Sequence, residues 1–222
     1  MIGMPARAAR RIIFWRHGRT EWNSAGRFQG QTDIDLDDTG VAQAERASGM
    51  LATLAPSRII SSDLSRARST AAPLARLLGL PVTTDERLRE TYAAEWEGLQ
   101  RAELEARFGD QLAQWSAGAD VRPGNTGESR VEVAERVSAA VQEALATLGA
   151  GEALVVVTHG GAARAGMGQL LGLPSEHWAI LGVLTNCSWS VLAENMTPYG
   201  PRWRMQEYNA GTLPEVALAD DR

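Results

Sequence analysis

The 222-residue sequence contains no lysine, and all 22 of its basic residues are arginine. Without lysine the chain cannot form a Schiff base, which excludes pyridoxal phosphate enzymes and lysine aldolases. It also cannot contain a Walker A P-loop, whose lysine reaches the bound phosphates. A GC-rich genome would produce the same bias towards arginine, so the bias by itself does not point to a function.

Cysteine and histidine are also scarce. Cys187 is the only cysteine, which excludes an internal disulfide and a cysteine-based zinc site. The histidines are His17, His159 and His177. No apolar run approaches the roughly 18 residues of a membrane span, and the run at 12–15 is too short for a signal peptide. We therefore expect no membrane partner and a location in the reducing cytoplasm.

The formal net charge is −5, and no basic stripe is visible. We therefore expect no nucleic-acid partner. An acidic chain that binds an anion must do so with a local site and not with its net field. Hydrophobic residues make up 44% of the chain and occur throughout, which excludes disorder for most of it. The length predicts a single domain over residues 1–222, with room for a small cap.

Apolar runs alternate with segments of helical spacing along most of the chain. The runs predict strands at 11–15, 58–61, 81–84, 153–158, 188–192 and 203–208. Helical spacing predicts helices at 39–54, 63–78, 99–115 and 128–148, and one after Gly161 that ends near Leu171. Thr39, and Asp63 or Ser62, are the expected caps of the first two. This alternation predicts an α/β fold of three layers, a mostly parallel sheet with helices on both faces.

Two of the predicted strands end in a histidine followed by glycine, at His17-Gly18 and at His159-Gly160-Gly161. Ligands of open α/β sheets lie beyond the carboxyl ends of the strands, so we expect His17 and His159 to meet in one crevice. A lone histidine is usually structural, but two in matching positions favour a site. The glycines would let an anion approach the backbone N–H groups. His177 is expected to be structural or exposed.

Arginines stand beside both elements of this site. Arg16 precedes His17, and Arg66 lies early in a predicted helix, where only a bound anion would favour a cation. Two arginines and two histidines indicate phosphoryl transfer through a phosphohistidine. A carboxylic acid must then protonate the leaving oxygen. Glu90, Glu95 and Glu97 all compete for that role, and the spacing does not choose among them.

Two other chemistries fit the sequence poorly. Asp33, Asp35, Asp37 and Asp38 resemble a calcium loop, but the sixth position is Asp38 instead of glycine, and the twelfth is Ala44 instead of glutamate. A serine hydrolase would need a Gly-x-Ser-x-Gly motif, and none occurs.

The segment Arg16-His-Gly-Arg-Thr-Glu-Trp-Asn23 resembles the Arg-His-Gly-x-Thr-x-x-Asn signature of the histidine phosphatase superfamily, in its phosphoglycerate mutase-like branch. Further motifs of that family follow in order. They are Arg27-Phe-Gln-Gly-Gln31, Leu36-x-x-x-Gly40-x-x-Gln-Ala44, Ser61-Ser-Asp-Leu-x-Arg-Ala67, Leu88-Arg-Glu90, Trp96-Glu-Gly98, Gly127-Glu-Ser129 and Val157-Thr-His-Gly-Gly161. One departure is Ala94, where many relatives have glycine. The resemblance implies a domain core over about residues 11–210 and a small cap or insert over about 95–127.

The resemblance also implies roles for individual residues. His17 would be the phosphorylated nucleophile, and Glu90 would be the proton donor. Arg16, Arg66 and His159 would complete the phosphate pocket. The substrate side would be lined by Gly18, Thr20, Asn23, Gln29, Gly30 and Gly160. No metal ion and no cofactor are expected, and the partner is a small-molecule phosphate ester.

The resemblance also bears on the substrate. The span between Glu90 and His159 is shorter than in true phosphoglycerate mutases, which favours hydrolysis over transfer. The segments Leu181-Gly-x-x-x-Asn186-x-Ser-Trp189 and Arg202-Trp-Arg-x-x-x-Tyr-Asn-Ala210 are similar to actinobacterial phosphatases of that family that act on glucosyl-3-phosphoglycerate. A broad-specificity phosphatase, a cofactor-dependent phosphoglycerate mutase and a non-catalytic sensor of phosphorylated ligands are the alternatives.

Two weaker expectations concern the sugar and the oligomer. Trp22, Trp96 and Trp203 could stack on a sugar, although packing in the core accounts for each of them equally well. The predicted strands at 188–192 and 203–208 could expose a sheet edge that pairs with a second copy, which would make the protein a homodimer.

Overall fold

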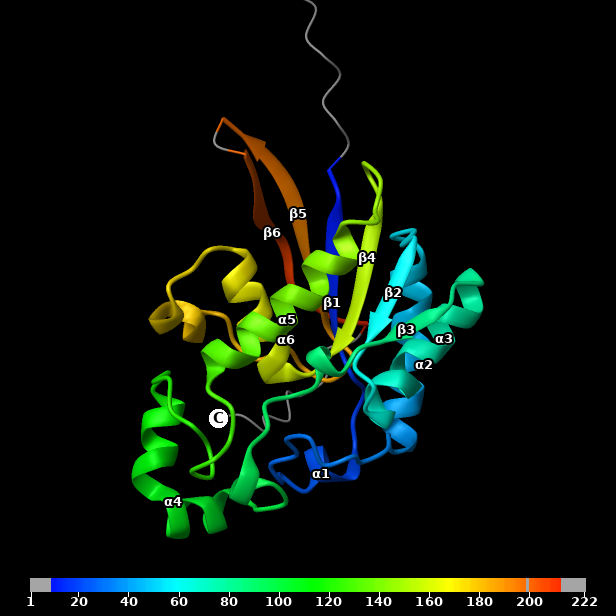
Figure 1. Cartoon of the computed structure of the whole chain (residues 1–222). Helices are drawn as coiled ribbons and strands as arrows, with labels where there is room; N and C mark the ends of the chain where they lie inside the picture. The colour runs from blue at the N-terminus through cyan, green and yellow to red at the C-terminus, as the bar shows by residue number, and fades with distance from the viewer. Residues whose placement is uncertain (1–8, 199, 213–222) are drawn as a thin grey trace, which may run out of the picture.

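A six-stranded sheet forms the middle of the computed structural model, which describes residues 9–198 and 200–212 (Figure 1). The strand order is β3-β2-β4-β1-β5-β6. The four parallel strands are β1 (Arg11–Arg16), β2 (Arg58–Ser61), β3 (Val82–Thr84) and β4 (Ala153–Thr158). The antiparallel strands β5 (Trp189–Thr197) and β6 (Gly200–Ala210) extend the sheet at the β1 side. The predicted mostly parallel α/β fold is confirmed.

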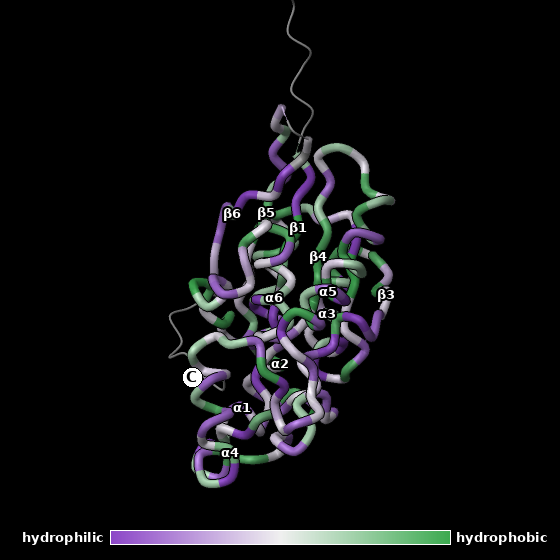
Figure 2. Tube along the Cα trace, turned by 60° about the vertical axis from the view of Figure 1, so that its left-hand side comes forward, coloured by the Kyte–Doolittle hydropathy of each residue, from purple (hydrophilic) through white to green (hydrophobic). Residues whose placement is uncertain are grey.

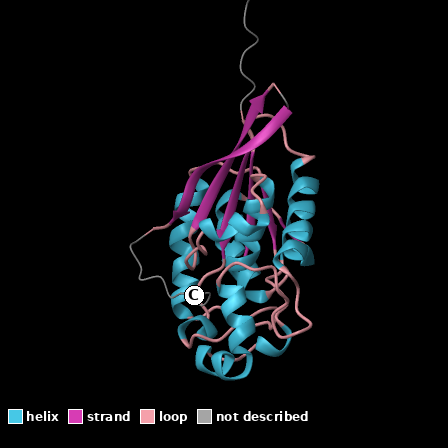
Figure 3. Cartoon of the chain, turned by 90° about the vertical axis from the view of Figure 1, so that its left-hand side faces the viewer, coloured by secondary structure: helices cyan, strands magenta, loops and turns pink. Residues whose placement is uncertain are grey.

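Helices cover both faces of this sheet (Figure 3). They are α2 (Asp38–Ala52) and α3 (Ser65–Leu78) on one face, and α5 (Arg130–Leu145) and α6 (Gly160–Leu170) on the other. Alternate residues of β1 pack against the two helical layers, because successive side chains of a strand point to opposite faces of the sheet. Ile12 and Phe14 pack with α5 and α6, whereas Ile13 and Trp15 pack with α2 and α3. The central strand β4 is hydrophobic, whereas the edge strand β6 is largely hydrophilic (Figure 2).

The N-caps of α2 and α3 differ from those that the sequence predicts. Asp37, and not Thr39, is the N-cap of α2, and its carboxylate accepts the Gly40 N–H. The prediction of Asp63 or Ser62 as the cap of α3 is wrong: the N-cap is Leu64, which has no capping side chain. The carboxylate of Asp33, distant in sequence, accepts the Ser65 N–H at 2.8 Å instead. A capping partner supplied from another loop leaves no local signal.

Four short helical segments lie between the elements that the sequence predicts. They are α1 (Glu21–Ser24) and the 3-10 helices Glu86–Leu88, Ala94–Trp96 and Ser175–Ile180. Strands β5 and β6 are longer than the predicted 188–192 and 203–208. The sequence predicts a frayed end over the last ten residues, 213–222, which lie outside the described residues. Among the described residues, no helix combines the length and the apolar character that crossing a membrane requires.

A third hydrophobic cluster, separate from the two on the sheet, includes α4 (Arg101–Ser116) and the segment before it. Trp96 lies at its centre, in edge-on contact with Trp115 and Phe28. Helix α4 lies beyond the carboxyl ends of β2 and β4, on the same side as α1 (Figure 1). Ala94 has a φ of 49°, in the left-handed region that favours glycine, which explains why a glycine suits this position.

Candidate active site

His17 and His159 follow two neighbouring strands of the sheet. The register of β1 and β4 pairs Arg16 with Thr158, so the next residues are the two histidines. Their ring centroids are 5.1 Å apart. Both side chains are buried, with exposed fractions of 2% and 0%. The prediction that these histidines meet at one edge of the sheet is confirmed.

Hydrogen bonding fixes which nitrogen of His17 can react. Nδ1 lies 2.7 Å from the carbonyl oxygen of Gly18. A carbonyl can only accept, so Nδ1 carries the proton and Nε2 keeps its lone pair. Burial, together with the charges of Arg66 and Arg16, holds the pKa of His17 well below its usual value. The imidazole is therefore neutral near pH 7 and presents Nε2 as a nucleophile.

His159 has the opposite tautomer. Arg66 Nε donates to its Nδ1 at 3.2 Å, so the ring proton lies on Nε2 and points to Ser62 Oγ at 2.9 Å. Burial and the adjacent Arg66 charge hold the pKa of His159 well below its usual value. The ring is therefore neutral in the unliganded site.

Two arginines bring positive charge to the histidines. Arg66 is fully buried, and its terminal nitrogens donate to the carbonyl oxygens of Thr32 and Gly30, both at 2.8 Å. Burial lowers the pKa of Arg66 to about 10, so it still carries its charge at neutral pH. Arg16 donates to the carbonyl oxygen of Leu184 at 2.6 Å. Carbonyl oxygens orient both guanidinium groups at the site, and a guanidinium group matches the geometry of phosphate oxygens.

These groups open into a pocket of about 450 Å³. Its lining residues are Arg16, His17, Phe28, Gln29, Gly30, Arg66, Glu90, Thr91, Trp115, Gly161 and Arg164. Six of the site residues predicted from the sequence are in this lining: Arg16, His17, Gln29, Gly30, Arg66 and Glu90. The amide oxygen of Gln29 accepts from Thr20 Oγ1, which turns the amide NH₂ of Gln29 to other acceptors.

The other predicted residues form a layer behind the lining. The Gly18 N–H donates to Thr70 Oγ1, and a Cβ on Gly18 would lie 2.5 Å from the Gly40 carbonyl oxygen. Thr20 and Asn23 form the capping box of α1. His159 and Gly160 are buried at the start of α6. Direct substrate contacts by Gly18, Thr20, Asn23 and Gly160 stay predictions.

Glu90 lies at the N-terminus of α6. Its two carboxylate oxygens accept the N–H groups of Gly161 and Ala162, both at 2.9 Å. The other two candidate acids lie elsewhere. Glu97 accepts the Gln31 N–H at 2.9 Å and the Thr32 hydroxyl, and Glu95 accepts from Asn125 Nδ2. Of the three carboxylates that the sequence left open, only Glu90 lines the pocket.

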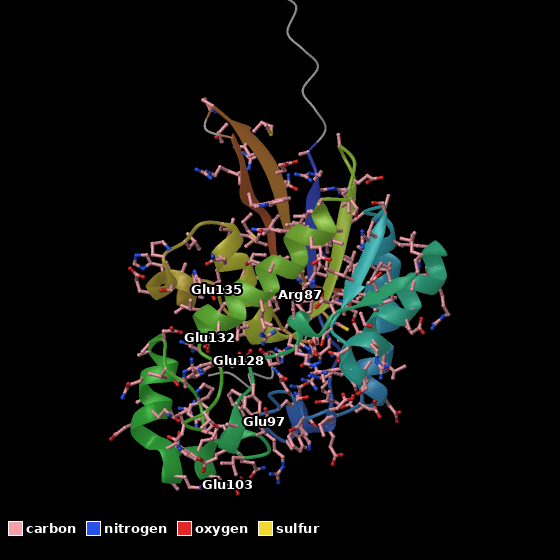
Figure 4. All side chains as sticks on the ribbon, in the orientation of Figure 1. Arg87, Glu97, Glu103, Glu128, Glu132 and Glu135 are labelled. Carbon is pink, nitrogen blue, oxygen red and sulfur yellow. The ribbon has the colours of Figure 1, made fainter. Side chains whose placement is uncertain are left out.

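The ion pair of Arg136 and Glu128 fixes the segment that carries Glu90. Arg136 donates to the carbonyl oxygens of Arg87, Arg89 and Glu90 at 2.6–2.9 Å and to Glu128 at 2.8 Å. Glu128 also accepts the Tyr92 N–H. Figure 4 places Glu128 below Arg87 and above Glu97 in that view. Glu128 belongs to the Gly127-Glu-Ser129 motif, but nothing in the sequence singled out Arg136.

Replacing Arg136 by glutamine is expected to lower kcat by about 100-fold, because Glu90 loses its backbone anchor and a displacement of about 1 Å costs that much. The inhibition constant for inorganic phosphate as a competitive inhibitor should change less than about threefold, because the residues that contact phosphate are unchanged. Arg136→Lys should recover part of kcat. Arg122→Gln, which breaks a comparable ion pair to Glu132 on α5, is the control. An unchanged kcat in Arg136→Gln would contradict the positioning role.

A residue from the C-terminal part of the chain also supports the His17 loop. Asn186 Nδ2 donates to the His17 carbonyl oxygen at 3.3 Å and to Asn23 Oδ1 at 3.1 Å. The Cys187 N–H donates to the same His17 carbonyl oxygen at 3.1 Å. The tail motif that contains Asn186 therefore reaches the nucleophile loop through hydrogen bonds.

The tryptophans near the pocket are not the ones the sequence suggested. Trp96 is buried in the α4 cluster, Trp22 contacts Gly98, and Trp203 packs against the core beneath α5 and α6. None of these three is in the pocket lining. Trp115 borders it instead. Spacing along the chain does not report which tryptophan ring lies beside the pocket.

The acidic cluster after Thr32 is used in capping. Asp33 and Asp37 cap the helices described above. Across the described residues, no group of three or more histidine, cysteine, aspartate or glutamate side chains is arranged to hold a metal ion.

Comparison with known proteins agrees with this geometry. Residues 12–211 match the family model of the histidine phosphatase superfamily (branch 1). The chain is 40% identical over 214 residues to the glucosyl-3-phosphoglycerate phosphatase of Mycolicibacterium vanbaalenii, covering 90% of this chain and 95% of that protein. It is 36% identical over 191 residues to a probable phosphoglycerate mutase of Yersinia pestis, covering 85% and 86%. The solved structure of a mycobacterial glucosyl-3-phosphoglycerate phosphatase with VO3 matches with a TM-score of 0.84 and 40% identity, over 93% of this chain and 100% of that one.

Proposed function

This chain belongs to the histidine phosphatase superfamily (branch 1) and is a phosphomonoesterase, and we propose that it hydrolyses glucosyl-3-phosphoglycerate through a phosphohistidine on His17. The observation that carries the proposal is the pocket in which His17 Nε2, two guanidinium groups and the Glu90 carboxyl group face one space.

The proposed reaction has two steps. In the first, His17 Nε2 attacks phosphorus, the bond to the ester oxygen breaks, and protonated Glu90 gives its proton to that oxygen. In the second, a water oxygen attacks phosphorus, the bond between phosphorus and His17 Nε2 breaks, and the Glu90 carboxylate takes a proton from the water. Inorganic phosphate leaves, and His17 Nε2 regains its lone pair. Arg16 and Arg66 stabilise the charge on the transferring phosphoryl oxygens throughout.

His159 would join this electrostatic stabilisation once substrate binds. A phosphate dianion beside the ring favours its protonated form, because opposite charges attract. The protonated ring donates from both nitrogens. Nε2–H would still donate to Ser62 Oγ. Nδ1, which accepts from Arg66 in the neutral ring, would carry a proton and donate to a phosphoryl oxygen.

The substrate assignment draws on two observations. Relatives named for glucosyl-3-phosphoglycerate are about 40% identical over nine-tenths of the chain. The tail motif that the sequence shares with such phosphatases contacts the His17 loop through Asn186. A cofactor-dependent phosphoglycerate mutase is the second candidate, since a relative that bears a mutase name is 36% identical. A broad-specificity phosphatase would keep the same chemistry.

The test is phosphate release in the presence of EDTA, without added metal. Glucosyl-3-phosphoglycerate, 3-phosphoglycerate, phosphoserine and p-nitrophenyl phosphate are compared side by side. We expect full activity with EDTA and the highest kcat/KM for the glucosylated acid, by about 100-fold or more, since a site built for a ligand's polar groups rejects analogues that lack them. Equal values for all four would remove the named substrate. Phosphoryl transfer between phosphoglycerates that depends on 2,3-bisphosphoglycerate would establish the mutase.

Three further features are part of the proposal. The chain is one domain in which the segment 95–127, with its own hydrophobic cluster around Trp96, caps the pocket through Trp115. The protein acts in the cytoplasm, where buried Cys187 stays reduced. It forms a homodimer through β6, the last strand in the sheet order of the described residues, and light scattering should give twice the monomer mass.

A further inference from the structure

The phosphate pocket continues into a second space of about 250 Å³. Both spaces share four lining residues, which are Thr91, Trp115, Gly161 and Arg164. The second space adds Arg130, Ala165 and Trp178. Arg16, His17, Arg66 and Glu90 line only the first. The second space is therefore a continuation of the pocket away from the phosphate-binding groups.

Glu90 marks the boundary between the two spaces. It lines the phosphate section, and its carboxylate is bound by the N–H of Gly161, which lines both. The proposed mechanism has Glu90 protonate the ester oxygen, which joins the phosphoryl group to the rest of the substrate. The part of the substrate beyond that oxygen leads towards the second space.

Arg164 lines both spaces and carries a positive charge. It lies three positions after Gly161 on α6, so the two side-chain positions are on the same face of the helix, about one turn apart. The residue is half-buried, and it makes no hydrogen bond or ion pair to any residue in 9–198 or 200–212. Arg130, by contrast, donates to the carbonyl oxygens of Trp115 and Ala119 and stacks on the Trp115 ring at 3.9 Å.

We propose that Arg164 binds a carboxylate on the leaving group and so selects phosphate esters of hydroxy acids. This inference rests on the proposed function and assigns a specificity residue to it. The guanidinium of Arg164 makes no hydrogen bond to a described residue and is partly open to solvent, so its donors are available to a ligand in the second space. The phosphoryl group already has Arg16 and Arg66, so a second anion is what Arg164 can satisfy.

The shape of the second space fits this assignment. Its walls include the rings of Trp115 and Trp178, and the Trp178 Nε1–H is already bound to the Leu173 carbonyl oxygen. Apolar walls with a few convergent polar groups are typical of a site that orients a small organic ligand, and here the charged groups are Arg130 and Arg164. A carboxylate matches the planar fork of a guanidinium, with two parallel hydrogen bonds, better than a hydroxyl does.

The test uses two esters that differ only at this group, 3-phosphoglycerate and glycerol 3-phosphate. Arg164→Gln should lower kcat/KM for 3-phosphoglycerate by about 10- to 100-fold, the loss typical of a charge-assisted hydrogen bond. The value for glycerol 3-phosphate should change less than about threefold. For Arg164→Lys, kcat/KM for 3-phosphoglycerate should lie between the wild-type and Arg164→Gln values, because lysine keeps the charge but lacks the planar guanidinium group. Arg76→Gln, on the surface of α3 and paired with Glu45, is the matched control.

Binding to a His17→Ala background separates this inference from the proposed function. Calorimetry with the same two esters, with and without Arg164→Gln, measures the subsite without turnover. Tighter binding of 3-phosphoglycerate that is lost in Arg164→Gln supports the subsite even if the wild-type protein hydrolyses neither ester. Equal losses for both esters, or no loss for either, overturn it, because Arg164 would then serve the phosphate, the fold or nothing in the pocket.

Discussion

Replacing His17 by alanine is expected to lower kcat by about four orders of magnitude or more, because removing a nucleophile leaves only the residual effect of binding and charge stabilisation. Substrate binding should survive, since Arg16 and Arg66 are oriented by carbonyl oxygens that do not involve the His17 ring. Phosphate release and phosphate binding are therefore the two quantities to measure in this variant.

A direct measurement of the intermediate makes the prediction specific. Wild-type protein mixed with p-nitrophenyl phosphate and quenched in alkali should gain the mass of one phosphoryl group, and peptide mapping should place it on His17. His177→Ala is the matched control, because that histidine is exposed and lies on the 3-10 helix Ser175–Ile180, outside the pocket. Wild-type rates in His17→Ala, or a phosphoryl group on another residue, would contradict the mechanism.

The meeting of His17 and His159 could be predicted from the sequence because the rule that applies is topological. Each histidine directly follows a buried apolar run, and parallel strands end at one edge of the sheet. The prediction did not require the strand order. The two rings lie as close as they do because β1 and β4 are neighbouring strands whose last residues pair with each other. Arg16 and Arg66 followed from their positions beside His17 and early in a predicted helix, and the family resemblance chose Glu90 among three carboxylates.

The residues that position the site could not be predicted from the sequence, because they act through contacts between separate segments of the chain. Arg136 donates to the carbonyl oxygens of Arg87, Arg89 and Glu90. Every residue type has a backbone carbonyl, so the sequence does not mark these acceptors. The carboxylate of Asp33 accepts the Ser65 N–H at the start of α3, although the sequence around Asp33 resembles a calcium loop. Such contacts depend on how loops fold onto each other, and pattern periodicity describes only single elements.

The aromatic residues show the same limit. Spacing marks a tryptophan as apolar but does not tell on which side of a cluster its ring lies. Trp96 is the buried centre of the α4 cluster, whereas Trp115, one of its ring partners, reaches the pocket. The two lie on different elements, Trp96 on the 3-10 helix Ala94–Trp96 and Trp115 near the end of α4, so their spacing along the chain does not report which of them reaches the pocket.

Replacing Glu90 by glutamine is expected to lower kcat for an alkyl phosphate ester by about 10²- to 10⁴-fold, the usual contribution of a general acid. The size of the loss should depend on the leaving group. p-Nitrophenolate leaves without much help from a proton, so the first step with p-nitrophenyl phosphate should slow by far less. The second step also loses its base, so the phosphohistidine should accumulate.

Rapid mixing measures both steps in one experiment. Glu90→Gln with p-nitrophenyl phosphate should give a burst of p-nitrophenol equal to the protein concentration, followed by slow turnover, while the alkyl ester gives no burst. Glu97→Gln is the matched control. It is the same substitution in the same loop, and Glu97 also accepts two backbone N–H groups, those of Gln31 and Ala93, but it does not line the pocket. If Glu90→Gln slowed both esters equally and without a burst, the loss would come from the start of α6, where Glu90 binds Gly161 and Ala162, and Glu90 would not be the acid.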